Sequence, residues 1–121
     1  MKYEIQVMVA VITEENMADI REILFGNPYD VIYYSEGGDL LDSKKEAVKE
    51  FKKQSATARR QDDGTIGIRI PELLRGEEKL DEDILQESGE EVYYLDRFKV
   101  LDCARFDEES LQLFRELGYE V

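Results

Sequence analysis

Three acidic residues, Asp81, Asp83 and Glu87, are spaced so that their carboxylates could bind a metal ion. Mg²⁺ and Ca²⁺ prefer oxygen ligands, and calcium-binding loops supply these ligands at alternate positions along the chain. Here Leu85 stands where a third ligand is required, and Gln86 stands where such a loop needs glycine. The spacing therefore predicts weak, diffuse cation binding and no dedicated metal site.

Other routes to catalysis lack their essential residues. The sequence contains no histidine, which excludes Ser-His-Asp and Cys-His catalysis and any metal site built on imidazole. The single cysteine, Cys103, lies between Leu101 and Ala104 in a strand-like run, which favours a buried thiol that acts as a small apolar side chain. Neither Gly37-Gly38 nor the glycines of 64–67 is followed by the Gly-Lys-Ser/Thr of a phosphate-binding loop. These absences predict a protein that is not an enzyme and holds no cofactor.

Charge is the most distinctive property of the sequence. The chain has 29 acidic residues against 16 lysines and arginines, a formal net charge of −13. The two signs are separated along the chain, which predicts one acidic and one basic partner-binding surface. The acidic surface is predicted to consist of Glu77, Glu78, Asp81, Glu82, Asp83, Glu87, Glu90 and Glu91, and the basic one of Lys45, Lys49, Lys52, Lys53, Arg59 and Arg60, with Lys44 beside them.

Several functions fit this charge pattern. The simplest interpretation is that both surfaces are solvated and partly neutralise each other, within one molecule or between two. We expect a non-catalytic protein-binding or regulatory domain whose partner has a basic surface, and the same charges allow a homodimer. Nucleic acid and anionic membranes are disfavoured as partners, because both bind through lysine and arginine.

Two alternatives remain open. One is an acidic antagonist that imitates nucleic acid and blocks a DNA- or RNA-binding protein, as accessory proteins of phages and mobile elements do. The other is a small ferredoxin-like enzyme or ligand-binding domain that uses tyrosine, arginine and carboxylate side chains. Tyr33-Tyr34 and Tyr93-Tyr94 each place one ring on either face of a predicted strand, so the outward rings could contact a partner.

The elements that must position these charges begin with a strand over residues 3–12, where alternation gives way to a fully apolar run. Thr13 can cap a helix that ends at Gly26, and residues 29–34 form a second strand. If both strands join one sheet as a βαβ unit, their connection must be right-handed.

The middle and end of the chain have clear start and stop signals. Ser43 and Glu46 form a capping box for a helix that we expect to run to about Arg60. Residues 65–70 alternate as a strand, Pro71 is expected to start a short helix that Gly76 closes, and residues 77–88 are allowed as a helix. Residues 92–106 are expected to be extended, and Asp107 to cap a final helix ending at Gly118. Residues 119–121 allow a last short strand.

Together these elements predict one α+β domain over residues 1–121. We expect a single mixed or antiparallel sheet of four to five strands with helices packed against it, and a ferredoxin-like order with residues 42–60 inserted. Glu4 and Gln6 interrupt any secretory leader, and the apolar run at 7–12 is far shorter than the ~20 residues of a membrane helix. A cytoplasmic location is therefore expected.

Overall fold

The computed structural model of the chain describes residues 1–31 and 34–121, without the side chains at 34 and 94–98. The predicted strand at 29–34 and the paired tyrosines at 33–34 and 94 therefore fall partly outside the described residues. The strands are β1 (Lys2–Ile12), β2 (Tyr34–Glu36), β3 (Thr57–Arg60), β4 (Ile66–Leu80) and β5 (Tyr93–Cys103), and the helices are α1 (Asp19–Phe25), the 3₁₀ helix η1 (Pro28–Asp30), α2 (Lys44–Lys52), α3 (Glu82–Ser88) and α4 (Glu108–Glu116).

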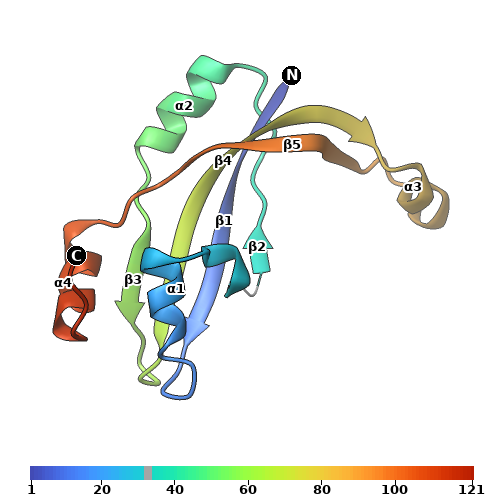
Figure 1. Ribbon diagram of the computed structural model, residues 1–121. Coiled ribbons are helices and arrows are strands. Elements are labelled where there is room, and N and C mark those ends of the chain that lie inside the picture. The colour runs from blue at the N-terminus through green and yellow to red at the C-terminus, as the bar shows by residue number, and fades with distance from the viewer. Residues whose placement is uncertain (32–33) are drawn as a thin grey trace.

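Within the described residues the strands form a single antiparallel sheet, which confirms the α+β class (Figure 1). Its order is β2-β1-β4-β3, and β5 pairs with the far half of β4. The two central strands are in register over eleven residues, from Lys2 opposite Gly76 to Ile12 opposite Ile66. The acidic segment that starts at Glu77 continues from the paired part of β4, and β3, which carries Arg59 and Arg60, lies beside β4 in the sheet.

The predicted opening βαβ unit is wrong. Strand β2 lies directly beside β1 and runs antiparallel to it, with Met8 opposite Ser35. A βαβ unit requires its two strands to be parallel, so no right-handed crossover is involved. The ferredoxin-like order is not confirmed for the same reason, because its split βαβ unit keeps another strand between the two parallel ones.

Pro71 lies within β4 and does not begin a helix, so the helix predicted over 71–76 is also wrong. Its carbonyl accepts a hydrogen bond from the amide of Ala104 at 2.8 Å, so the missing N–H of the proline faces the same side of β4. On that side of β4, the pairing with β3 extends only to Arg69, and the pairing with β5 starts at Glu72. Proline is tolerated in the strand because it occupies the gap between two neighbouring strands.

The helix that follows Ser43 is shorter than predicted. Ser43 caps α2 as expected, accepting a hydrogen bond from the amide of Glu46 at 3.3 Å. The helix ends at Lys52, however, and Thr57–Arg60 is strand β3, which places Ala58 opposite Ile68 in the sheet. Burial of Ala58 through this long-range pairing prevails over the local tendency to continue the helix.

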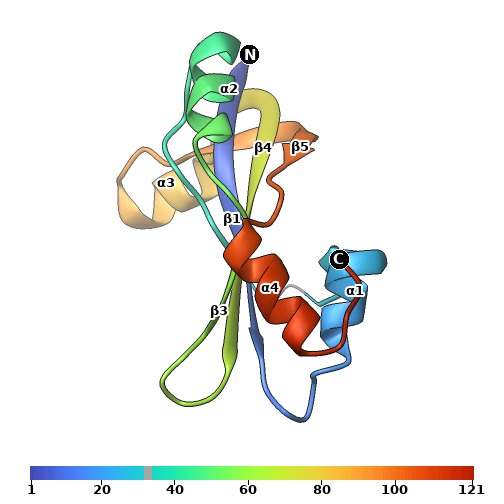
Figure 2. The same cartoon turned by 90° about the vertical axis from the view of Figure 1, so that its left-hand side faces the viewer.

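Two apolar cores lie on opposite faces of the sheet. Even-numbered side chains of β1 and β4, such as Ala10 and Ile68, pack with Phe114 of α4. Odd-numbered ones, such as Tyr3 and Leu73, pack with α2. Because alternate residues of a strand point to opposite faces, α1 and α4 cover one face and α2 covers the other (Figure 2).

The second half of β4 and most of β5 extend away from these cores as a long hairpin that ends in α3 (Figure 1). Asp81 caps α3, and Gly89 ends it in the left-handed region at φ 73°. The hairpin replaces the predicted helix over 77–88, because Glu77 and Glu78 belong to β4 and only 82–88 is helical. We call residues 77–91 the acidic arm.

The C-terminal helix begins at its predicted cap, since the Asp107 carboxylate accepts a hydrogen bond from the amide of Ser110 at 2.9 Å. Gly118 follows the helix with φ 98°. Residues 119–121, allowed above as a last short strand, form no strand.

Candidate functional site

The structure brings all eight predicted acidic residues onto the acidic arm. Glu77 and Glu78 lie at the end of β4, three carboxylates lie on α3, and the last two lie in the loop that follows α3. Asp81 between them is the cap of α3, where its carboxylate accepts a hydrogen bond from the amide of Ile84 at 3.3 Å. The residues on α3 are Glu82, Asp83 and Glu87, and those in the loop are Glu90 and Glu91.

Most of these carboxylates face solvent. Lys2 contacts the carboxylate of Glu78 at 3.3 Å, and the hydroxyl of Tyr93 donates a hydrogen bond to Glu91 at 3.2 Å. Of the arm's eight carboxylates, five are exposed and have no hydrogen bond or ion pair among the described residues: Glu77, Glu82, Asp83, Glu87 and Glu90. These five carboxylates therefore form a block of negative charge that no described side chain neutralises.

The predicted basic surface is divided between two places. Lys45, Lys49 and Lys52 lie on α2, and Lys53 follows it in an ion pair with Glu50 at 3.1 Å. The two arginines are not on the helix, contrary to the prediction, because residues 57–60 are β3. Only the lysines of α2 therefore form a basic helix face.

Arg59 connects β3 to α4 through Asp107. Its guanidinium donates to both oxygens of the carboxylate, at 3.2 and 2.6 Å, and to the hydroxyl of Ser110 at 2.6 Å. The Ser110 hydroxyl is buried and also accepts a hydrogen bond from the amide of Ala58 at 2.8 Å. The Arg59 guanidinium, followed by the Ser110 hydroxyl, holds the pKa of Asp107 well below its usual range. This network holds β3 against α4, and the guanidinium of Arg59 is already paired with a carboxylate of the same chain.

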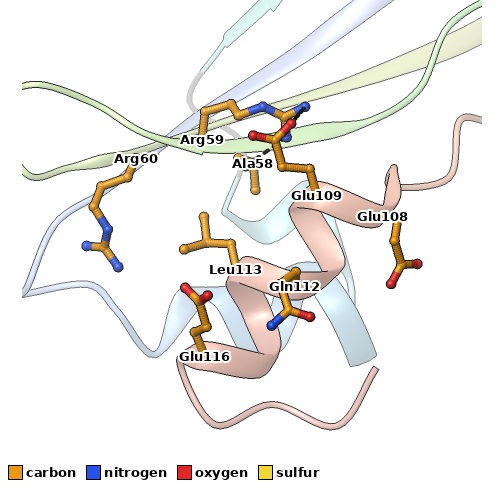
Figure 3. A pocket seen from close by; sticks show the side chains of 8 residues that line it. All are labelled: Ala58, Arg59, Arg60, Glu108, Glu109, Gln112, Leu113 and Glu116. Atoms are coloured by element: carbon orange, nitrogen blue, oxygen red, sulfur yellow. Dashed lines mark hydrogen bonds and ion pairs between the residues drawn. The ribbon is translucent and has the colours of Figure 1, made fainter.

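An open groove of about 580 Å³ runs between β3 and α4 (Figure 3). Figure 3 shows Arg59 turned toward Glu109, to which it is paired at 3.3 Å, and Arg60 at the other end of the groove. Arg69 on the neighbouring strand β4 pairs with Glu36 at 2.6 Å. The groove is lined by Ala58, Arg59, Arg60, Glu108, Glu109, Gln112, Leu113 and Glu116.

A buried carboxyl group was missed by the sequence analysis. Glu72 lies in β4 with 4% of its surface exposed, and the hydroxyl of Tyr29 is its hydrogen-bond partner. Burial raises the pKa of Glu72 and of the neighbouring Cys103 thiol. Burial of the hydroxyl and the nearby Glu72 carboxylate raise the pKa of Tyr29 to about 12. A single acidic residue within the otherwise apolar run Ile70–Leu74 could have indicated a buried carboxyl group, but Pro71 led to the prediction of a helix there.

Among the side chains that the structure describes, which leave out 32–34 and 94–98, no three His, Cys, Asp or Glu are grouped closely enough to hold a metal ion. In the same part of the chain, each helix is too short or too polar to cross a bilayer. Comparison of the chain with models of protein families, with curated proteins and with solved structures finds no match. Function is therefore inferred from the charged surfaces themselves.

Proposed function

We propose that this chain is a non-catalytic protein-binding domain that acts through its segregated charges, with the acidic arm as the recognition element for a partner with a basic surface. The observation that carries the proposal is the set of five exposed carboxylates of the arm that have no partner in the described residues. Opposite surface charges guide partners together and raise the rate of association. An element that projects from the folded core can enter a concave surface.

The basic helix supports this proposal by its position. α2 and α3 lie far apart in Figure 1, and within the described residues no charge on one of these helices is paired with a charge on the other. The simplest interpretation of the sequence, in which the acidic and basic surfaces neutralise each other within one molecule, therefore lacks support.

Cys103 has no second cysteine in the chain to form a disulfide with, which is in keeping with a cytoplasmic location.

The test is a comparison of two variants with the same net charge. In the arm variant Glu82, Glu87 and Glu90 become lysine, whereas Asp81 is left intact because it caps α3. In the control variant Glu14, Glu15 and Asp62, which are exposed and distant in sequence from the arm, become lysine.

Partners recovered from lysate with the unmodified chain are identified, and the affinity of each variant for the purified partner is measured at low and high salt. We expect the arm variant to bind at least about tenfold more weakly and the control to bind as before, because only the arm substitutions remove most of the arm's negative charge and with it the attraction to a basic surface. Equal affinities for the two variants would eliminate the acidic arm as the recognition element.

A second candidate is the acidic antagonist of a nucleic-acid-binding protein. It is favoured by the distance of α2 from the arm, because the lysines then do not interrupt the line of carboxylates. A duplex carries one negative charge per ~1.7 Å along its axis, and a row of carboxylates can occupy the same basic groove. Competition distinguishes the two candidates: duplex DNA or RNA must displace the chain from its partner if it acts as a mimic.

The third interpretation, a small enzyme or ligand-binding domain, receives less support. The groove between β3 and α4 is open, and its polar lining residues are mostly exposed. Ligand sites are usually concave and largely apolar, with a few convergent polar groups. Of the two arginines in the groove, Arg59 is already bound to Asp107.

A further inference from the structure

The outer face of α2 combines an apolar centre with a basic rim. Val48 is partly exposed, and the helical spacing places Lys44, Lys45, Lys49 and Lys52 around it. These five side chains line an open surface groove of about 680 Å³, which we call the lysine groove. Within the described residues none of the four lysines has an ion pair or hydrogen bond, so the lysine groove is a helix face without a partner.

The acidic arm has the complementary arrangement. Ile84 on α3 is 41% exposed. Glu82 and Asp83 precede it, and Glu87 lies one helical turn after it. An isoleucine flanked by carboxylates matches a valine flanked by lysines, with an apolar centre and a charged rim as in ordinary protein interfaces.

We infer that the lysine groove on α2 binds α3 of a second copy of this chain. One chain cannot make this contact with itself in the described conformation, because the two helices lie apart in both views (Figures 1 and 2). The inference rests on the proposed function, since it uses the same acidic arm, and it names the occupant of the basic surface. Ile84 packs on Val48, and the carboxylates around Ile84 pair with the lysines of the groove.

The edge of β5 is a poorer surface for self-association. Its pairing with β4 shifts register between Leu73 and Leu74 and again between Arg75 and Glu77. Such irregularities twist an edge strand and oppose its pairing with another strand. The complementary helices therefore provide the better contact between copies.

Charge-swap variants test the inference. In the first variant Lys44, Lys45, Lys49 and Lys52 become glutamate, so that both the groove and the arm are acidic. In the second Glu82, Asp83, Glu87 and Glu90 become lysine, so that both are basic, while Asp81 is kept as the cap of α3. Each variant should fail to self-associate, whereas an equimolar mixture should associate because every groove then meets an arm of opposite sign.

The measurement is sedimentation velocity and light scattering over a concentration series at low salt. The unmodified 14.1 kDa chain should reach at least about twice its monomer mass. High salt should weaken association by about tenfold or more, since the contact is exposed and screened. A chain that carries both swaps should again self-associate, which shows that the substituted surfaces are folded. A control with the exposed residues Glu14, Glu15, Asp62 and Glu120 changed to lysine has the same net charge as the second variant and should behave as the unmodified chain.

Three results would overturn the inference: an unmodified chain that stays monomeric at low salt, single-swap variants that associate as the unmodified chain does, or a mixture that stays monomeric. These results do not decide the proposed function. Loss of binding to a basic partner in the arm variant, with no self-association of the purified chain, would leave the proposed function intact and remove only this inference.

Discussion

Substitution of Asp107 by alanine should destabilise the fold by about 2–3 kcal/mol. The carboxylate caps α4 through the amide of Ser110, and loss of such a cap costs about 1 kcal/mol. Its pair with Arg59 is bidentate but partly exposed, so solvent screening limits it to about 1 kcal/mol or less. The buried Ser110 hydroxyl also loses a hydrogen-bond partner, a further contribution of about 1 kcal/mol.

The matched variants separate these contributions. Asp107→Asn keeps a capping oxygen and should lose only the charged part, about 1 kcal/mol. Asp62→Ala removes an exposed carboxylate in the turn before β4 and should change stability by less than about 0.5 kcal/mol. Urea unfolding followed by circular dichroism gives each free energy of unfolding, and Asp107→Ala should lower the melting temperature by about 10 °C.

The effect of pH has a defined sign. Because the pKa of Asp107 is lowered in the folded state, its stabilisation is complete above its unfolded pKa of about 4 and is lost as the pH falls below that value. The difference between the unmodified chain and Asp107→Ala should therefore shrink between about pH 4 and pH 2. A difference below about 0.5 kcal/mol at pH 7, or one that stays constant down to pH 2, would refute the assigned role of Asp107.

Three further outcomes are expected. Glu72→Gln should stabilise the fold by about 1 kcal/mol at pH 7 in urea unfolding, because it removes a buried charge. Burial raises the pKa of Glu72, so ionisation of its carboxyl group destabilises the fold only as the pH rises above the unfolded pKa. The stability gained from glutamine should therefore vanish below about pH 4. A gain that is independent of pH would contradict this role of Glu72. Gly89→Ala places a side chain at φ 73°, at a cost of about 1 kcal/mol. Amide hydrogen exchange in α3 should become faster, whereas exchange in the two cores should not change. Equal acceleration in both would show that the acidic arm does not unfold separately from the cores. Phe114→Ala should cost about 3–5 kcal/mol in the same urea assay, because this ring is fully buried and meets Phe106 edge to face at 5.0 Å, and a loss below about 1 kcal/mol would contradict its place in the core.

The features that were predictable from the sequence depend on neighbouring residues. Ser43 and Asp107 are caps because each bonds an amide three residues ahead, and the alternation over 66–70 marks a strand without reference to the rest of the chain. The α+β class follows from such local signals.

Features that depend on distant residues were not predictable in this way. Pro71 is acceptable in a strand only because β3 begins and β5 ends beside it, and Thr57–Arg60 becomes a strand only by pairing with β4. For the candidate site, the acidic residues lie on one segment because they are contiguous in the sequence, and their role as a partner-binding surface stays a prediction. The prediction that Arg59 lies on the helix with the lysines is wrong, because its partner Asp107 is 48 residues away in the sequence.

The pairing of β1 with β4 has a consequence for synthesis on the ribosome. Strand β1 pairs along its full length with β4 only after the residues up to Gly76 have been made, about 60 residues later, and until then only the short strand β2 can pair with it. At 5–20 residues per second the nascent β1 waits for roughly 3–12 s with an apolar face uncovered. The five consecutive apolar residues Met8–Ile12 are exposed to other chains for that time. The high density of like charge elsewhere in the chain opposes aggregation through this apolar segment, so the acidity of the protein also reduces aggregation during its synthesis.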